Sequence, residues 1–178
     1  MQGAIEMNGF HIHGLPLPIH VQDVWRRKDY QDFTLPYLYW EGARVYHDVD
    51  QVIPDASWVT LAFNSERWDT DNIHDNVTNN SRLTCKTAGV YAVSFHGYWE
   101  AWVAGERHAY IQLNDTTIIV YQVQPLSNTG RGDHVFSTIY KLAVDDYLET
   151  RVYQNRGGIL DFKSTAERTP EFSMQRIG

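Results

Sequence analysis

The stretch GVYAVSFHGYW at residues 89–99 constrains the fold more than any other part of the chain. Successive residues of a β-strand alternate between its two faces, so odd and even positions lie on opposite sides. The odd positions carry mostly bulky apolar residues, namely Tyr91, Val93, Phe95, Gly97 and Trp99. The even positions carry Ala92, Ser94, His96 and Tyr98. A strand with one solvated face shows charges on that face, and neither face has one here. The pattern therefore predicts a strand that is covered on both sides.

The chain from residue 43 onward follows the same short, alternating pattern. Runs rich in β-branched and aromatic residues recur between turn residues, and no convincing amphipathic helix interrupts them. The predicted strands are 43–48, 57–65, 81–87, 89–99, 107–115, 116–124, 134–144, 147–155, 158–162 and 171–178. About ten strands of this kind indicate an all-β, antiparallel two-sheet jelly-roll sandwich as a head spanning residues 43–178.

Residues 1–42 differ from the rest and are predicted to form an irregular N-terminal arm. Pro16 and Pro18 favour extended backbone, and a thin apolar stripe allows a short helix near residues 21–28. The arm has no periodicity that would let it pack on itself, yet it contains many aromatic residues. We expect these to dock on another protein, since aromatic side chains are enriched at interfaces. They are Trp25, Tyr30, Phe33, Tyr37, Tyr39 and Trp40.

Composition narrows the classes of function. The chain of 178 residues has a net charge of −7, which argues against a nucleic-acid partner because such proteins present a basic face. No window approaches the roughly 18 apolar residues of a membrane helix. The first residues show neither the basic nor the apolar region of a signal peptide, so none is expected. Cys85 is the single cysteine, which rules out an intrachain disulfide, and its strand context predicts a small buried residue.

Several spaced motifs resemble the globular head of complement C-one-q. They run in the order Phe63-Asn64, Trp68-Asp69, Leu83-Thr84-Cys85, the Gly-x-Tyr-x-Val-x-Phe run from Gly89, residues 142–154 and residues 172–178. The resemblance covers residues 43–178 and implies a jelly roll of the kind shared with the tumour-necrosis-factor superfamily, which forms tight trimers. The sequence departs from the pattern at Asp145 and Met174, where glycine is usual, and at Val93, where phenylalanine is frequent.

The resemblance implies what covers the second face of residues 89–99. By position, Tyr91, Val93 and Phe95 would belong to the core of the sandwich. Ala92, Ser94, His96 and Tyr98 would then face neighbouring subunits near a three-fold axis of a homotrimer. The alternative is a central strand of a monomer that lies beneath a loop.

The sequence offers little that indicates chemistry. It has no nucleophile motif, phosphate-binding loop or paired-cysteine zinc site, so we expect neither an enzyme nor a cofactor. The weak metal candidates are His11, His13, Asp69, Asp71 and Asp75. For the acids a solvated loop is the preferred interpretation, because Ile73 breaks the calcium-loop pattern. The tripeptide Arg131-Gly132-Asp133 is interpreted as turn chemistry.

Taken together, these features predict a trimeric virion structural protein, a phage head decoration or fibre. Its arm would dock on a capsid or tail protein and its head would project from the virion surface, the chain having been made in the host cytoplasm. The alternative is a receptor- or glycan-binding module that recognises a host surface. In that case Trp99 and Trp102, beside Glu100, would stack on sugar rings, although both could simply end a strand.

Overall fold

The structure is a computed structural model and describes residues 5–7, 10–12, 41–125 and 132–178. The chain divides into two compact units, Met1–Tyr39 and Trp40–Gly178. In the first unit, β1 (Ile5–Met7) pairs antiparallel with β2 (Phe10–Ile12). The sequence had suggested only irregular backbone there. The six aromatic docking residues, His13 and the possible helix at 21–28 lie outside the described residues.

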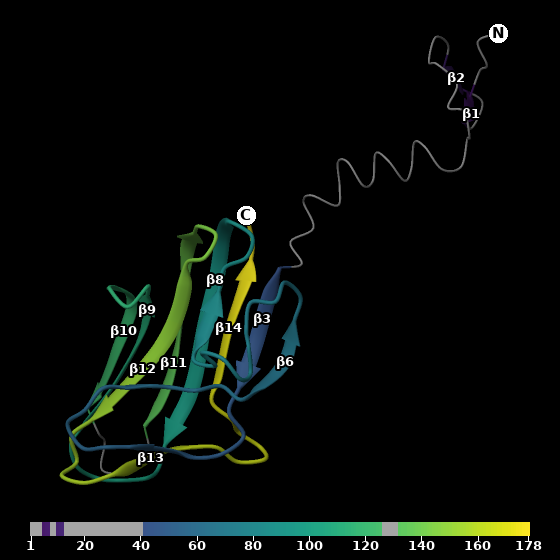
Figure 1. The fold of residues 1–178 in the computed structure, drawn as a ribbon. Coiled ribbons are helices and arrows are strands. Elements are labelled where there is room, and N and C mark those ends of the chain that lie inside the picture. The colour runs from purple at the N-terminus through teal and green to yellow at the C-terminus, as the bar shows by residue number, and fades with distance from the viewer. Residues whose placement is uncertain (1–4, 8–9, 13–40, 126–131) are drawn as a thin grey trace. The chain divides into compact units, whose positions relative to one another are not determined.

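The second unit is an all-β sandwich of two antiparallel sheets, as the sequence predicted (Figure 1). One sheet has seven strands in the order β4-β13-β8-β14-β3-β6, with β11 paired to the other edge of β8. Its members are β3 (Gly42–Tyr46), β4 (Gln51–Ile53), β6 (Ser65–Asp69), β8 (Gly89–Trp99), β11 (Asp133–Leu142), β13 (Leu160–Lys163) and β14 (Glu171–Arg176).

The other sheet has five strands in the order β10-β9-β12-β5, and β7 also pairs with β12. Its members are β5 (Val59–Thr60), β7 (Arg82–Thr84), β9 (Glu106–Leu113), β10 (Thr117–Pro125) and β12 (Tyr147–Gln154). None of the residues that the structure describes forms a helix long and apolar enough to cross a membrane.

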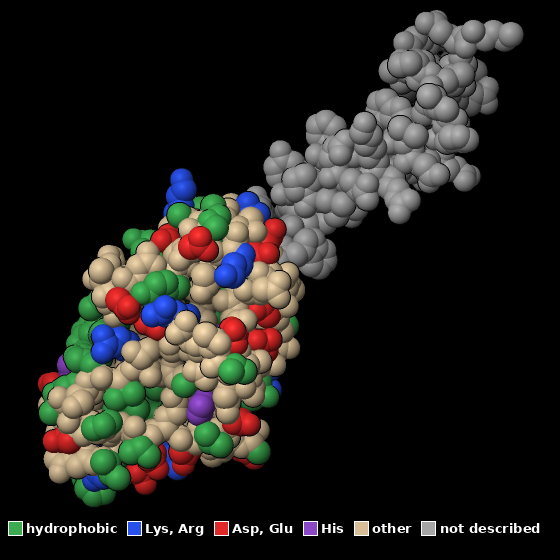
Figure 2. Space-filling view, viewed as in Figure 1, with side chains coloured by type: hydrophobic (Ala, Val, Ile, Leu, Met, Phe, Trp, Pro, Cys, Tyr) green, Lys and Arg blue, Asp and Glu red, His purple; other side chains and the backbone are tan. Residues whose placement is uncertain are grey.

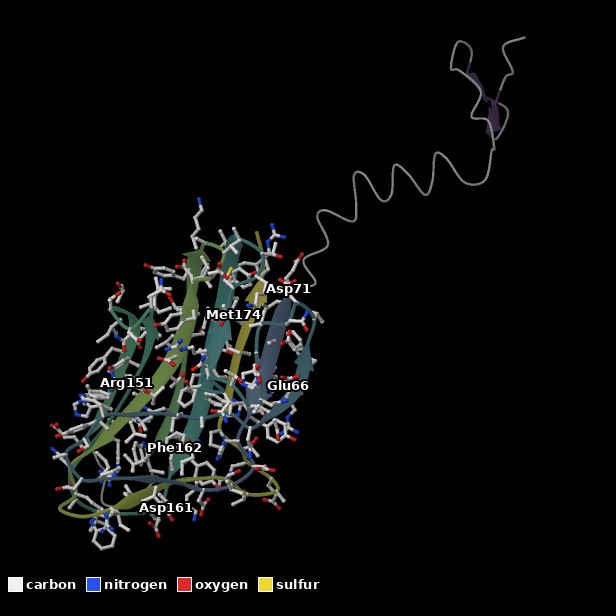
Figure 3. The ribbon with its side chains drawn as sticks, viewed as in Figure 1. Glu66, Asp71, Arg151, Asp161, Phe162 and Met174 are labelled. Atoms are coloured by element: carbon white, nitrogen blue, oxygen red, sulfur yellow. The ribbon has the colours of Figure 1, made fainter. Side chains whose placement is uncertain are left out.

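The core fills the space between the two sheets. On β8 the odd positions from Tyr91 to Trp99 are buried, and the aromatic rings of neighbouring strands pack on them. The ring of Phe95 lies 5.3 Å from that of Phe136 and 6.0 Å from that of Phe162, and Trp99 meets Phe162 edge-on at 5.0 Å. Figure 3 labels Phe162 and Met174, two members of this core. The predicted inward parity of residues 89–99 is therefore confirmed.

The strand predicted at residues 57–65 is wrong in its extent. Only Val59–Thr60 is a strand, in the five-stranded sheet, and β6 in the seven-stranded sheet begins at Ser65. The residues between them cross from one sheet to the other, with Leu61 and Phe63 still fully buried. Their backbone N–H groups donate to the carbonyls of Thr150 and Asn80 instead of to a single partner strand. Alternation in the sequence marked the buried side chains correctly but could not reveal this change of sheet.

Candidate functional site

The even-numbered face of β8 points away from the core, and nothing in the described part of the chain covers it. Ser94 and His96 are exposed, and Ala92 and Tyr98 are half-buried. The register places Ser94 between Ser137 of β11 and Ser173 of β14, whose hydroxyl lies 2.7 Å from that of Ser94. We call this surface of the seven-stranded sheet the β8 face.

Two aliphatic side chains on β11 extend the β8 face. Ile139 lies opposite Ala92, and Val135 lies opposite His96. They are 65% and 69% exposed, which is unusual for aliphatic residues on a sheet and is typical of a surface that another protein covers. Along β8 and β11 the middle of the β8 face therefore consists of small, hydroxyl and aliphatic side chains without a charge, and the charged Arg44 of β3 lies beside it, opposite Ser173.

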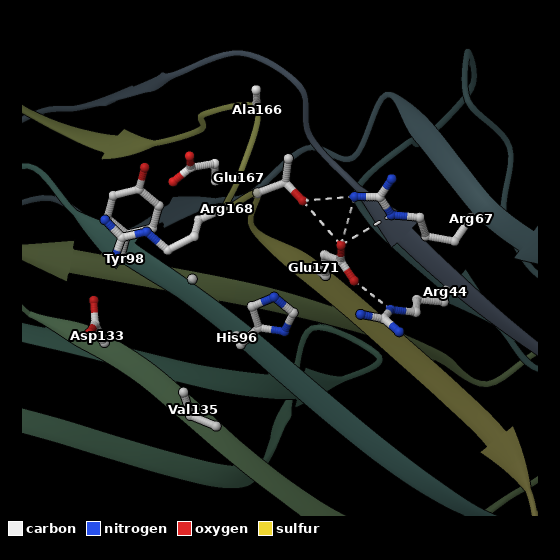
Figure 4. A pocket seen from close by; sticks show the side chains of 12 residues that line it. Arg44, Arg67, His96, Tyr98, Asp133, Val135, Ala166, Glu167, Arg168 and Glu171 are labelled. Carbon is white, nitrogen blue, oxygen red and sulfur yellow. Dashed lines mark hydrogen bonds and ion pairs between the residues drawn. The ribbon is translucent and has the colours of Figure 1, made fainter.

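Charged residues gather at one end of the β8 face, where they line a pocket of about 370 Å³ (Figure 4). Glu171 is only 6% exposed and accepts hydrogen bonds from Arg67, at 2.9 Å and 3.1 Å, and from Arg44. Burial on its own raises the pKa of Glu171, but the hydrogen bonds from Arg67 and Arg44 outweigh it and hold the pKa below its usual range. The carboxylate is therefore an ionised structural anchor.

Arg168 and Tyr98 of this pocket contact one another. The guanidinium carbon of Arg168 lies 4.4 Å from the centre of the Tyr98 ring, within range of a cation–π contact. Desolvation lowers the pKa of His96, while Glu171 opposes and Arg44 supports this shift. His96 is therefore neutral at neutral pH. The hydroxyl of Thr169 in this pocket donates to Glu171 at 3.1 Å, but the carboxylate also accepts from Arg67 and Arg44, which lower its pKa and make it a poor base.

A second candidate surface lies on the outward face of the five-stranded sheet, on the opposite side of the sandwich. Trp58 lies at its centre, with its ring 4.6 Å from Tyr110 and 5.3 Å from Tyr153. The rings of His108 and Tyr121 lie 6.0 and 6.3 Å from the Trp58 ring and complete this surface. The imidazole Nδ1 of His108 is hydrogen-bonded to the hydroxyl of Tyr121. We call these five residues the outer aromatic surface.

Part of the outer aromatic surface is open to solvent. Tyr121 is 47% exposed and Trp58 36%, and Val123 beside them on β10 is 42% exposed. Burial raises the pKa of the Tyr121 hydroxyl, and the nearby Glu106 adds to the effect, so the hydroxyl stays protonated. The sequence analysis missed this surface. The alternation of His108 and Tyr110 is visible in the sequence, but the convergence of three strands on Trp58 depends on strand register.

The structure corrects the interpretation of one of the two tryptophans proposed to stack on sugar rings. Trp99 ends β8 and is only 2% exposed, so it cannot stack on a sugar, and the prediction is wrong for this residue. It contributes to the core instead, because it lies on the inward parity of β8. Trp102 is 43% exposed and packs against Arg156, whose guanidinium carbon lies 4.1 Å from the ring centre.

Two of the three candidate acids in the loop at residues 69–75 hold its backbone in place. Asp69 accepts backbone N–H groups of Asp71, Ile73 and His74, and Asp75 accepts those of Val77 and Thr78. One oxygen of Asp71 is buried without a hydrogen-bond partner. Within the described ranges, no three His, Cys, Asp or Glu side chains come together as a metal site. The backbone of His11 lies in β2, and its side chain is outside the described part.

The structure also shows where Cys85 and Asp133 lie. Cys85 is fully buried directly after β7, and burial raises the pKa of its thiol, as suits an unreactive residue. Asp133 begins β11, where it pairs with Tyr98 of β8, and Arg131 lies outside the described residues. Figure 2 shows acidic and basic side chains interspersed over the visible face of the head, without a continuous basic area.

Comparison with solved structures places the fold among the complement and tumour-necrosis-factor jelly rolls. The globular domain of zebrafish complement 1qA protein matches with a TM-score of 0.57 and 14% identity, covering 78% of this chain and 98% of that domain. Eiger, a tumour necrosis factor from S. frugiperda, matches with a TM-score of 0.58 and 11% identity, covering 79% of this chain and 94% of its own.

Murine APRIL is similar to the same extent, with a TM-score of 0.56 and 5% identity over 76% of this chain and 99% of that one. No protein-family model matches the sequence, and no curated protein matches it either. At such low identity the likeness establishes the jelly-roll fold alone, and the predicted fold class is confirmed.

Proposed function

We propose that the chain is a non-enzymatic module that assembles as a homotrimer through the β8 face. The observation that carries this proposal is the uncharged middle of that face on a central strand. Small residues at Ala92 and Ser94 allow close backbone approach, and the exposed Val135 and Ile139 provide apolar area to bury. The resemblance to complement and tumour-necrosis-factor heads, which implies a trimer, points to the same face.

Light scattering on the full chain tests the assembly. We expect a mass of three times 20.6 kDa. The variant Ser94→Lys should reduce the mass to that of a monomer with unchanged circular dichroism, because it places three unpaired charges in the interface. Thr117→Lys, at an exposed position of β10, is the matched control and should remain trimeric. A monomeric wild-type protein, or a folded Ser94→Lys trimer, would contradict the proposal.

A finer proposal is that the trimer is a virion structural protein, a head decoration or fibre exposed on the virion surface. It is supported by the aromatic composition of residues 1–42, which suits docking on a capsid or tail protein. Co-sedimentation with purified virus particles tests it. Replacing Trp25, Tyr37 and Trp40 by alanine should abolish binding, and a chain whose binding survives these changes does not dock through its arm.

The alternative function is recognition of a host-surface glycan, and the outer aromatic surface favours it. Exposed rings of Trp58 and Tyr121 offer faces on which a sugar can stack, and Tyr and His groups offer hydrogen bonds to its hydroxyls. A glycan array tests this function. Tyr121→Ala should weaken binding about tenfold or more, whereas Trp102→Ala, which removes an equally exposed ring elsewhere, should leave it unchanged. A wild-type protein that binds no saccharide has no such function.

A further inference from the structure

An arginine that has no carboxylate partner among the described residues lies inside the sandwich. Arg107 is fully buried because it shares the inward parity of β9 with Ala109 and Ile111, two residues of the core. Its Nη1 donates to the carbonyl of Glu106 at 3.0 Å. Its Nε and Nη2 are buried and have no hydrogen-bond partner in the described structure.

Tryptophan and histidine side chains from the opposite sheet reach the same region. The guanidinium carbon of Arg107 lies 5.5 Å from the centre of the Trp99 ring, and the Trp99 ring lies 6.4 Å from that of His134. The indole Nε1 of Trp99 is also buried without a partner. Gly132 borders the cluster, since a Cβ on it would lie 3.3 Å from Oε1 of Gln124, 3.4 Å from Cδ1 of Trp99 and 3.6 Å from Cγ of Arg107. The described residues therefore leave three hydrogen-bond donor atoms without acceptors here, and Nε2 of His134 is also buried without a partner among them.

Among the described residues no carboxylate lies in this cluster, and the cation–π contact with the Trp99 ring compensates the positive charge of Arg107 only in part. Glu106 and Asp133 are its acidic neighbours in the sequence and across the sheet, but strand parity directs both side chains to the outer faces. Burial lowers the pKa of Arg107, and the charge of Arg156 lowers it further, yet a guanidinium does not deprotonate in proteins. His134 is neutral, because burial lowers its pKa to about 4, and its Nδ1 bonds to Oε1 of Gln122 at 3.0 Å.

A buried water molecule would satisfy these donors but would leave the charge uncompensated. An isolated ion in the protein interior costs far more than an unmade hydrogen bond, so buried charges are normally paired. The donors are one guanidinium and one indole N–H, which are groups that bind halides and carboxylates. The enclosed position favours a small ion.

We propose that Arg107 and Trp99 bind a small inorganic anion, chloride in size and charge, between the two sheets of the head. The anion neutralises the guanidinium and links β9 of one sheet to the end of β8 in the other. It thereby stabilises this end of the sandwich. This role is independent of the assembly and recognition functions proposed above.

Thermal unfolding of the full chain in sodium chloride and in sodium gluconate, at equal ionic strength, tests the proposal. Chloride should raise the melting temperature saturably by about 3–8 °C, since a ligand that binds only the folded state stabilises it. Arg107→Met should remove the difference between the two salts. Arg156→Met, which removes a neighbouring positive charge outside the cluster, should retain it.

Equal melting curves of the wild-type protein in both salts, or a chloride effect that persists in Arg107→Met, would overturn the proposal. If Arg107→Met does not fold, crystals of the wild-type protein soaked in bromide decide the question. An anomalous peak within hydrogen-bonding distance of Arg107 and Trp99 supports an anion site. Ordinary water density without an anomalous peak at that position excludes it.

Discussion

Asp145 shows at the scale of one residue how backbone conformation explains an unusual side chain. Its φ angle is 68°, in the left-handed region that favours glycine, and its N–H donates to the carbonyl of Cys85 at 2.9 Å. The complement-type pattern has glycine at this position. Aspartate is one of the few other residues that adopt this conformation at modest cost, so the turn survives the substitution.

The effect of a substitution at Asp145 on stability should depend on how readily the new residue adopts a positive φ angle. We expect Asp145→Gly to change the free energy of unfolding by less than about 0.5 kcal/mol, and Asp145→Val to lower it by about 1–2 kcal/mol, because a β-branched residue is strained in the left-handed region. Urea unfolding of both variants measures the difference. Equal stability of the two would show that this turn does not require a positive φ.

Glu171 gives a prediction on pH dependence. Its pKa is lower in the folded state than in the unfolded chain, so its stabilising contribution is complete above the unfolded value of about 4.5 and is lost as pH falls through the folded value. Glu171→Gln should reduce the free energy of unfolding at pH 7 by about 1.5–3 kcal/mol, since it removes hydrogen bonds between charged groups.

Urea unfolding at pH 7 and at pH 3 measures this effect. The difference between wild type and Glu171→Gln should shrink at pH 3, because below about pH 4.5 the unfolded chain takes up a proton on Glu171 more readily than the folded protein does. Glu167→Gln is the control, because Glu167 lines the same pocket in an exposed position. A difference that is equal at both pH values would show that the ionised form of Glu171 is not the stabilising one.

At the scale of the strand, β8 organises the seven-stranded sheet. It pairs with β11 on one side and with β14 and β13 on the other, and its two faces contribute to the core and to the β8 face. Gly97 lies on the inward parity, where a Cβ would approach the ring atoms Cε1 and Cζ of Phe162 to 2.4 and 2.5 Å. The glycine is therefore needed for the close packing of β13 on β8.

Alanine at Gly97 should be poorly tolerated. We expect Gly97→Ala to lower the free energy of unfolding by about 1–3 kcal/mol, because the added methyl displaces the buried ring of Phe162. Gly158→Ala is the matched control and should change stability by less than about 0.5 kcal/mol, since its nearest neighbours lie 3.8 Å away on a flexible arginine. A Gly97→Ala protein as stable as its control would mean that the ring moves freely.

At the scale of the whole molecule, the start of the head rests on backbone contacts just before residue 43. The N–H of Arg176 donates to the carbonyl of Glu41 at 2.8 Å, and the N–H of Thr70 donates to that of Gly42 at 3.0 Å. Gly42 also opens β3, which pairs with β14. The unit that the contacts define accordingly begins at Trp40.

Two truncated chains should therefore differ in stability. We expect residues 40–178 to unfold cooperatively, and residues 43–178 to be less stable by about 1–3 kcal/mol, because the latter lacks these hydrogen bonds. Chemical unfolding at matched protein concentration measures the difference, which keeps the effect of assembly constant. Equal stability would support residue 43 as the start of the head.

The sequence alone determined the fold class and the sidedness of β8. Alternation is a local property of a strand, so it separated Tyr91, Val93 and Phe95 from the face that carries Ala92 and Ser94 without knowledge of any neighbour. It also indicated the uncharged face from which assembly is proposed. The turn residues between the runs were sufficient to predict most of the other strands.

Only the tertiary structure decided which segments meet. Residues 61–64 cross between the sheets, Arg44 and Arg67 converge on Glu171, and three strands bring their rings to Trp58. Arg107 becomes a buried charge because its strand turns that parity toward Trp99. These placements depend on strand order and register, which arise from contacts between residues far apart in the chain. No local pattern in the sequence predicts which strands become neighbours.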